Sequence, residues 1–534
     1  MPDDFIYGMD VSAVPSLEAS GVKYRDEYGD EKDVFAILAD NGVNYIRVRI
    51  WNDPYNSETR KGYGGGNCDV NNAIAIGKRA TASGMKLLVD FHYSDFWADP
   101  QKQNAPKTWK NYTLAQKESA LFSFTKDTLN ALKREQVDVG MVQVGNEINN
   151  FHMCGETEAT NTIALLKKGS QAVREVYPGA MVAVHFTNPE KGRYPSVAAT
   201  LASNNLDYDV FGTSYYPYWH GTLANLSSTL STVATRYNKK TMVLETSYLW
   251  TEKTFDIFGN TEPKEGDTFP HEISMQGQYD QVQDVIETIG KNTTGGIGVC
   301  YWEGTWVGVN GGTGTWEENQ ALWDRYGSGW ACLAAKEYDK EVWQTEGSAV
   351  DNETFFDEKG VLLPSIEAFH HEKAEPSPTP DPEKSELLTN GSFELGTEPW
   401  QVESLTEGVT GFQTFAAEED QWATFVEGSK GLHIWDPSPI HAKIYQRVEN
   451  VAAGTHTFKI SMMGSCEGAT VRPYALTSSG KTVLGDALAL NGYNVWDEQS
   501  CEFTLNADET VLVGVDVDFV SGDGWAWFDG ASLK

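Results

Sequence analysis

Two glutamates that each close an apolar run are the residues of this chain best placed to do chemistry. Glu147 ends "MVQVGNE" and Glu245 ends "TMVLE". A carboxylate at the end of a buried strand is unfavourable unless it is paired or has a chemical task. Two such groups facing one another suit glycosidic hydrolysis, in which one protonates the leaving oxygen and the other attacks the anomeric carbon or activates water.

The stretch "YIRVRIW" offers a structural alternative for the same two carboxylates. Its arginines, Arg47 and Arg49, would form salt bridges with Glu147 and Glu245 at the end of a barrel. An arginine beside a nucleophilic carboxylate is also expected in an enzyme, because it keeps that group ionised. The residues alone leave both interpretations open.

An alternation of short apolar strands with helical segments must position these side chains. Eight strands are predicted to begin near residues 5, 43, 85, 138, 180, 207, 240 and 295, and helical patterns separate them, as at 70–84, 117–136 and 161–179. Eight such repeats predict an α/β fold, the (β/α)8 TIM barrel. A doubly wound open sheet is the rival, but no GxGxxG follows a strand, which disfavours a dinucleotide-binding version.

Polar and aromatic residues stand where each predicted strand ends. In a (β/α)8 barrel these carboxyl-terminal ends form the active site. A single such residue is more often structural, since aspartates and arginines at barrel ends pair with each other, but the set as a whole predicts a site. Its members are Asp10, Arg47, Arg49, Asp90, His92, Asn146, Glu147, His185, Tyr215, Tyr216, Glu245, Trp302 and Glu303.

The proline-rich stretch "HEKAEPSPTPDPEKSE" divides the chain. Prolines alternating with charges favour an extended spacer over helix or central strand. We predict a barrel over 1–371, a linker over 372–386 and a β-sandwich over 387–534, where strands and turn residues occur without helical periodicity.

Charge and composition narrow the partners. The formal net charge of −35 argues against nucleic acid or an anionic membrane surface, and no run of about 18 apolar residues is present to span a membrane. The six cysteines lack zinc-site spacing and indicate no disulfide-dense scaffold. Seventeen tryptophans and 23 tyrosines fit either large cores or flat platforms for sugar rings. We expect a monomer.

The motifs of the first 371 residues resemble glycoside hydrolase family 53, the endo-β-1,4-galactanases. In chain order they include "IRVRIWNDP", "DFHYSDFWADP", "QVGNEIN", "HFTNPE", "LETSY", "YWEGTW" and "GSAVDN". The resemblance implies a retaining endo-hydrolase of β-1,4-galactan, the side chain of pectic type I arabinogalactan. Glu147 would be the acid/base and Glu245 the nucleophile, with carboxyl groups about 5–5.5 Å apart.

The same resemblance implies the surroundings of the two glutamates. Asn146 would hold the sugar 2-hydroxyl, Tyr216 would hydrogen-bond Glu245, and Trp302 would form the floor of the −1 subsite. Catalysis itself would need no cofactor. The remaining residues expected to bind substrate are Arg49, Asp90, His92, Asp95, Trp97, His185, Glu303 and Trp306.

Bacterial members of the family carry a calcium-binding loop after the seventh strand, which reads "WTEKTFDIFGN" here. The resemblance implies a structural calcium ion held by Asp256, Asn260, Ser348 and Asp351. Thr254 and Phe258 depart from the expected Asp and His, so fewer anionic ligands predict a weaker site.

The segment from 387 resembles galactan-binding β-sandwich modules such as family 61. That resemblance implies a structural calcium held by Glu394 and Asp529, whereas an adhesion or spacer sandwich is the alternative. The tryptophans considered for sugar binding, most of them expected in the core, are Trp400, Trp422, Trp435, Trp496, Trp525 and Trp527.

Two other functions stay open at this point. A β-1,4-mannanase or cellulase of the same clan would share the two glutamates. A polysaccharide-binding protein without activity would not need both. The start "MPDDFIYGMD" lacks the basic and apolar parts of a signal peptide. We expect a secreted or cell-surface protein whose signal peptide is absent from this chain.

Overall fold

The computed structural model describes most of the chain and divides it into two compact units, Met1–Ala374 and Glu375–Lys534. The described residues are 1–2, 4–264, 266–370, 387–388, 390–391, 393, 399–406, 412–416, 425–426, 430–466, 468–478 and 480–534. The predicted linker, 372–386, lies outside them.

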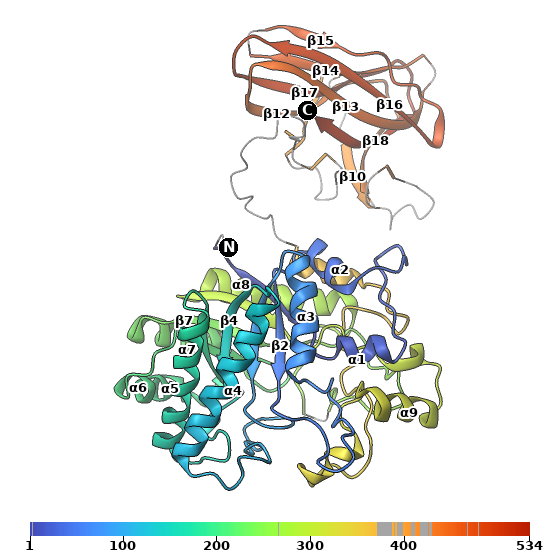
Figure 1. The fold of residues 1–534 in the computed structure, drawn as a ribbon. Helices are drawn as coiled ribbons and strands as arrows, with labels where there is room; N and C mark the ends of the chain where they lie inside the picture. The colour runs from blue at the N-terminus through green and yellow to red at the C-terminus, as the bar shows by residue number, and fades with distance from the viewer. Residues whose placement is uncertain are drawn as a thin grey trace. The chain divides into compact units, whose positions relative to one another are not determined.

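Eight parallel strands close into a barrel in the first unit, in chain order from β1 to β8 (Figure 1). This arrangement confirms the predicted (β/α)8 fold. The strands are β1 (Ile6–Asp10), β2 (Tyr45–Ile50), β3 (Lys86–Phe91), β4 (Val139–Val144), β5 (Met181–Phe186), β6 (Val210–Ser214), β7 (Lys240–Glu245) and β8 (Gly296–Tyr301).

Helices surround these strands (Figure 1). They are α1 (Val14–Ala19), α2 (Val34–Asp40), α3 (Val70–Ala82), α4 (Leu114–Arg134), α5 (Ala159–Val176), α6 (Tyr194–Ser203), α7 (Leu223–Tyr237), α8 (Met275–Asn292) and α9 (Trp316–Tyr326). Capping residues in the local sequence determine where several of these helices begin. Thr113 and Gln116 form a capping box that starts α4 three residues before the predicted helix. Asp69 caps α3 by accepting a hydrogen bond from the Asn72 amide.

The fourth strand ends earlier than the sequence pattern suggests. The apolar pattern of 138–147 predicts a strand through residue 147, but β4 stops at Val144 because Gly145 has φ +87°. A Cβ at Gly145 would meet Met153 Sδ at 2.7 Å, so a side chain would also lack room there. The chain therefore turns at Gly145 and presents Asn146 and Glu147 from a loop above the barrel.

The second unit is a sandwich of two antiparallel sheets, as predicted. One sheet has the order β10-β11-β18-β13-β16 and the other β15-β14-β17-β12-β9. Buried side chains of both sheets, such as Ile434, Phe458 and Val515, share one core. The strands are β9 (Gln401–Ser404), β10 (Phe412–Ala416), β11 (Lys430–Asp436), β12 (Ile440–Val451), β13 (Gly454–Ser465), β14 (Thr470–Thr477), β15 (Thr482–Leu484), β16 (Gly492–Leu505), β17 (Glu509–Phe519) and β18 (Gly524–Leu533).

No helix in the described part of the chain is long and apolar enough to cross a membrane.

Candidate active site

A cleft with a volume of about 540 Å³ opens where the barrel strands end. That volume suits a ligand of several rings. Both Glu147 and Glu245 line it. The other predicted site residues that line it are Arg49, His92, Trp97, Asn146, Tyr216 and Trp302.

Glu245, the last residue of β7, is held by two donors. Arg47 Nη2 donates to Oε1 at 2.9 Å and the Tyr216 hydroxyl donates to Oε2 at 3.0 Å. The residue is only 7 % exposed, so these bonds act where water screens them little. Burial raises the pKa of Glu245 above its ordinary value and the Asp90 charge adds to the rise, while the Arg47 charge and the Tyr216 hydrogen bond oppose it. Arg47 and Tyr216 thus stabilise the ionised form of a carboxylate whose burial favours the protonated form.

Glu147 occupies a different environment across the cleft. Its backbone is left-handed, with φ +46°, which is uncommon for a residue with a side chain. The Ile148 amide donates to the His185 carbonyl at 3.0 Å and fixes the loop in this conformation. Glu147 Oε1 lies 2.6 Å from Ser214 Oγ, the last residue of β6. Burial and then the charge of Glu245 raise the pKa of Glu147 to about 8. One glutamate is thus suited to hold a proton and the other to be ionised.

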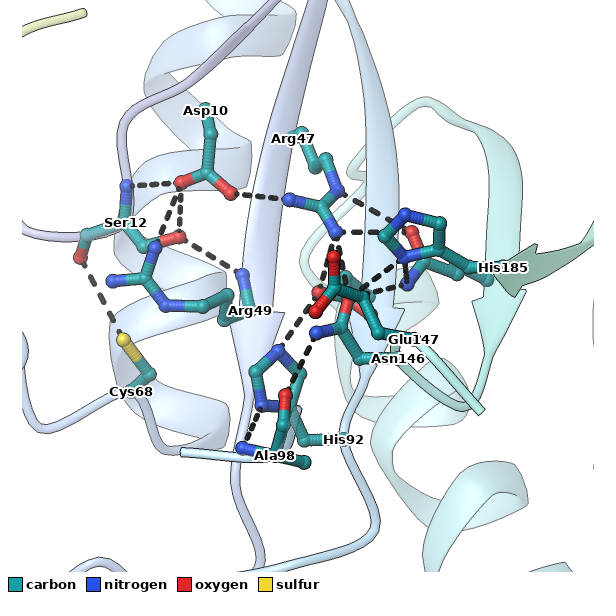
Figure 2. Close-up of polar contacts among 12 residues, drawn as sticks. Asp10, Ser12, Arg47, Arg49, Cys68, His92, Ala98, Asn146, Glu147 and His185 are labelled. Carbon is teal, nitrogen blue, oxygen red and sulfur yellow. Dashed lines mark hydrogen bonds and ion pairs between the residues drawn. The ribbon is translucent and has the colours of Figure 1, made fainter. Parts of the chain in front are cut away.

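Arg47 connects these groups beneath the cleft. Figure 2 shows its guanidinium between Asp10 on one side and Asn146 and His185 on the other. Nη1 donates to Asp10 at 3.1 Å, and Nη2 donates to Asp90 at 2.9 Å and to Asn146 Oδ1 at 3.1 Å. Arg47 is fully buried, so these acceptors offset the loss of its hydration.

Asn146 is locked by contacts on both ends of its amide. Oδ1 accepts from Arg47 and from Gln143 Nε2 at 3.0 Å, and Nδ2 donates to the Ala98 carbonyl at 2.9 Å. These partners fix which amide atom is the oxygen. The second hydrogen of Nδ2 is left for a ligand in the cleft.

His92 has its protonation fixed by neighbours. Its Nδ1 accepts from Trp51 Nε1 at 3.0 Å and from the Ala98 amide at 3.2 Å, so Nδ1 carries no proton. Nε2 therefore carries the proton and donates to Asp90 Oδ2 at 3.0 Å. These three hydrogen bonds fix the orientation of the His92 ring where it lines the cleft.

Tryptophans form an aromatic wall beside Arg49. Trp97 and Trp330 are stacked, with ring centroids 4.5 Å apart, and Trp302 lies 6.3 Å from Trp97. The Arg49 guanidinium lies 4.6 Å from the Trp97 centroid and donates to Glu303 at 2.6 Å. Arg49 is thus held by Glu303 and Asp10 while its guanidinium packs over the indole of Trp97.

Five of the predicted substrate-binding residues lie beneath the cleft lining. Asp90 and His185 are buried around Arg47, Glu303 pairs with Arg49, and Asp95 accepts from the Lys107 amide at 2.7 Å. Trp306 is also fully buried and donates to the Ser328 carbonyl. In this arrangement they hold other residues in place.

The fold brings to the site some residues that no local sequence pattern singles out. Ser214 contacts Glu147, and Gln143 contacts Asn146. Ser214 is the residue at which β6 ends, whereas the sequence pattern favours Tyr215 and Tyr216, one and two residues later, as the strand-end residues. The further lining residues include Asp99, Lys102, Trp219, His220, Glu262, Trp330 and Glu353.

The residues of the predicted calcium site lie together in the barrel unit. Asp351 accepts from the Phe255 and Asp256 amides at 2.8 and 3.1 Å, and from Asn260 Nδ2 at 2.8 Å. Asp256 accepts from the Ser348 amide at 2.6 Å. Asn260 Oδ1 is buried and has no hydrogen-bond partner among the described residues. No group of three or more His, Cys, Asp or Glu side chains suited to a metal occurs in the part of the chain described.

The tryptophans of the sandwich unit separate into core and surface. Trp400 is buried and donates to the Asn390 carbonyl at 2.9 Å, while Trp435 is 45 % exposed. Trp527 is buried, and Trp496 and Trp525 are half-buried. Trp422 and Glu394 lie outside the described residues. Asp529, the other predicted ligand of a second calcium, accepts from the amides of Val426 and Gly530.

Comparison with known proteins gives a consistent result. Residues 6–369 match glycosyl hydrolase family 53. The chain is 52 % identical over 375 residues to the endo-beta-1,4-galactanase of Bacillus subtilis, covering 70 % of this chain and 86 % of that protein. It is 34 % identical over 337 residues to the arabinogalactan endo-beta-1,4-galactanase of Cellvibrio japonicus, covering 60 % and 86 %.

A solved structure agrees with these sequence relationships. The GH53 catalytic domain of Ignisphaera aggregans superposes with a TM-score of 0.61 at 34 % identity, covering 69 % of this chain and 96 % of that one. The barrel, the two glutamates of the cleft and the matched residues lead to one assignment: this chain belongs to glycosyl hydrolase family 53.

Proposed function

We propose that the chain is an endo-β-1,4-galactanase that hydrolyses galactan and type I arabinogalactan with retention of configuration. Relatives 52 % and 34 % identical carry that activity in their names, and the chain spans 86 % of each. The catalytic pair is Glu147 as acid/base and Glu245 as nucleophile. No step of this reaction calls on a cofactor.

In the first step the ionised Glu245 attacks the anomeric carbon of the sugar in the cleft. The bond from that carbon to the leaving oxygen breaks while Glu147 gives its proton to the oxygen. The products are a galactosyl ester of Glu245 and a shortened chain. Arg47 and Tyr216 hold the attacking carboxylate, and Asn146 Nδ2 donates to the 2-hydroxyl.

In the second step Glu147, now ionised, removes a proton from water. The water oxygen bonds to the anomeric carbon, the bond to Glu245 breaks, and Glu147 is protonated again. Two inversions restore the original configuration. One observation supports this division of labour above others: Glu245 accepts from Arg47 and Tyr216, whereas burial and Glu245 raise the pKa of Glu147 to about 8.

Substitution of each glutamate tests the assignment. In Glu245→Gln, turnover of galactan should be lost while affinity for galacto-oligosaccharides is kept. In Glu147→Gln, turnover should fall about 10²–10⁴-fold. NMR of the first product should show the β-anomer. Inverted product, or full activity of either variant, would refute the proposal.

Substrate choice separates this proposal from other enzymes of the same clan. Reducing-sugar release should be highest on β-1,4-galactan and much lower on mannan and cellulose. Equal release from mannan would instead assign a mannanase.

The sandwich unit is proposed as a carbohydrate-binding module, and the outer face of its β11–β18 pair supports this. Trp435 and Trp525 are neighbours in the β-ladder, and Tyr493 lies 6.1 Å from Trp525, all outside the core. Exposed aromatic rings stack on the C–H faces of sugars. Trp435→Ala and Trp525→Ala in the full chain should weaken retention on galactan gels and leave hydrolysis of short oligosaccharides unchanged. Unchanged retention in both would favour a spacer.

A structural calcium ion at Asp256 and Asp351 belongs to the proposal. The two buried carboxylates, the unpartnered Asn260 Oδ1 and the Ser348 hydroxyl are hard oxygen donors of the kind Ca²⁺ prefers. When bound, the ion would supply positive charge to this loop and take no part in hydrolysis.

We further propose a secreted monomer, since a plant polysaccharide is an extracellular substrate. The barrel over 1–371 would be joined through the proline-rich segment 372–386 to the sandwich over 387–534.

A further inference from the structure

A continuous set of close polar contacts connects Glu147 to the centre of the site, and the direction of each hydrogen bond can be deduced. Glu147 Oε1 lies 2.6 Å from Ser214 Oγ, which lies 2.9 Å from His185 Nε2. His185 Nδ1 in turn lies 2.8 Å from Asn146 Oδ1. His185 is fully buried and does not line the cleft, so it reaches substrate only through its neighbours.

The Asn146 end of this connection fixes the histidine. Arg47 Nη2 has only protons to offer, and it points at Asn146 Oδ1, so that atom is an acceptor. Two acceptors 2.8 Å apart would repel, hence His185 Nδ1 carries a proton and donates to Asn146. Gln143 Nε2, also near Nδ1, has its two hydrogens satisfied by the Gly145 carbonyl and Asn146 Oδ1.

The neutral state of His185 then fixes the serine. Burial and the neighbouring Arg47 charge lower the pKa of His185 well below its usual value, so only one ring nitrogen is protonated. Nε2 is therefore an acceptor, and the single hydroxyl proton of Ser214 is donated to it. Ser214 Oγ must then accept from Glu147, which requires the proton to be on the carboxyl group.

We propose that Ser214 and His185 are positioning residues that store the transferable proton on Glu147 in the resting enzyme. In this state Glu147 Oε1, Ser214 Oγ, both ring nitrogens of His185 and Asn146 Oδ1 each have a hydrogen-bond partner. The terminal torsion of a glutamate turns readily. Rotation of the Glu147 carboxyl group would turn its proton away from Ser214 Oγ and toward the leaving oxygen. After transfer the Ser214 hydroxyl turns from His185 Nε2 to the ionised Glu147. This inference rests on the proposed acid/base function of Glu147.

The hydrogen bonds through Ser214 and His185 favour the protonated form of Glu147, because ionisation of Glu147 leaves His185 Nε2 without its donor. In the reverse arrangement His185 Nε2 is protonated and donates to Ser214 Oγ, whose hydroxyl then donates to Glu147. That arrangement would favour the ionised form of Glu147. Other charged or titratable groups face Glu147 from neighbouring elements and act in both arrangements alike: Glu245 from β7, Asp99 from the loop after β3, Arg47 from β2, Tyr194 from α6 and Tyr216 from the loop after β6.

His185→Phe distinguishes the two arrangements by the sign of one shift. Without His185 the Ser214 hydroxyl is free to donate to ionised Glu147, so the alkaline limb of kcat/KM should move down by roughly one pH unit. Replacing the imidazole by an apolar ring would by itself raise the pKa of Glu147, so the loss of a polar neighbour cannot explain a lowered pKa. A limb at wild-type pH or moved to higher pH would overturn the proposal. His271→Phe, at a partly exposed histidine paired with Asp284, is the control and should keep the wild-type limb.

A spectroscopic measurement decides the same question without activity. In ¹⁵N-histidine-labelled full chain, the His185 signals, identified by their loss in His185→Phe, should show the Nδ1–H tautomer at pH 6. An Nε2–H tautomer would overturn the inference. Full activity of Glu147→Gln would instead defeat the proposed function and leave the tautomer result standing.

Discussion

Arg47 Nη2 lies 2.9 Å from Glu245 Oε1 and also 2.9 Å from Asp90 Oδ2, with all three side chains buried. One cation therefore serves two carboxylates, and a third, Asp10, contacts the other guanidinium nitrogen. The two hydrogens of Nη2 are shared among Glu245, Asp90 and Asn146, and the delocalised charge of the guanidinium suits this sharing. Arg47 therefore favours the ionised form of Glu245 from a position beneath the cleft lining.

Arg47→Lys should impair the enzyme through Glu245. A lysine keeps the charge but cannot reach Asp10, Asp90 and Glu245 together, so the pKa of Glu245 should rise. The acid limb of kcat/KM should move to higher pH, and kcat/KM at pH 6 should fall by about 10-fold or more. Arg174→Lys, at a partly exposed pair with Asp207, is the matched control. An unmoved acid limb in Arg47→Lys would contradict the prediction.

The pH profile of kcat/KM should be bell-shaped, with its alkaline limb near pH 8. Activity is lost there because Glu147, whose pKa is raised to about 8, gives up the proton it must donate. The Asp99 charge contributes to that rise, so Asp99→Asn should shift the limb to lower pH. Initial rates on a galacto-oligosaccharide between pH 4 and 10 measure both. A limb near the ordinary glutamate pKa would exclude Glu147 as the acid.

Glu147 should reduce the stability of the barrel as pH rises. Its folded-state pKa of about 8 exceeds the ordinary 4.5, so the folded state binds the extra proton between these values. The free energy of unfolding must then fall as pH increases through that window. Glu147→Gln lacks the titration and should be more stable than wild type by roughly 1–3 kcal/mol at pH 8.

The difference in stability between the two proteins should be independent of pH below about 4.5, where both states of Glu147 are protonated. Urea unfolding at pH 4, 6 and 8 checks this course. A difference that is the same at all three pH values would show that Glu147 has an ordinary pKa in the folded protein.

Removal of calcium should destabilise the loop that carries Asp256. Burial and Asp351 raise the pKa of Asp256 well above its usual value when no cation is present, which indicates a mutual repulsion that an ion would relieve. EDTA should lower Tm by several degrees in wild type and have little effect on Asp351→Asn. Elemental analysis should find calcium in wild type only. Equal Tm with and without EDTA would argue against the ion.

The sequence alone determined the architecture and the identity of the two central carboxylates. Eight apolar segments alternating with helical ones allow few folds other than a barrel, because each strand must be buried and each helix must cover it. Glu147 and Glu245 were identifiable because each closes such a segment. The sandwich was predictable for a similar reason, since its turns and short strands carry local signals.

Tertiary structure decided which neighbours act on those carboxylates. Arg47 and Arg49 are two residues apart on β2, yet one reaches Glu245 and the other pairs with Glu303. No local pattern separates them, because the choice depends on side chains contributed by β7 and by the loop after β8. Ser214 shows the same limit, since its meeting with Glu147 and His185 joins three strands or loops distant in sequence. Contacts of this kind arise from closure of the barrel, which brings together strand ends that the sequence keeps apart.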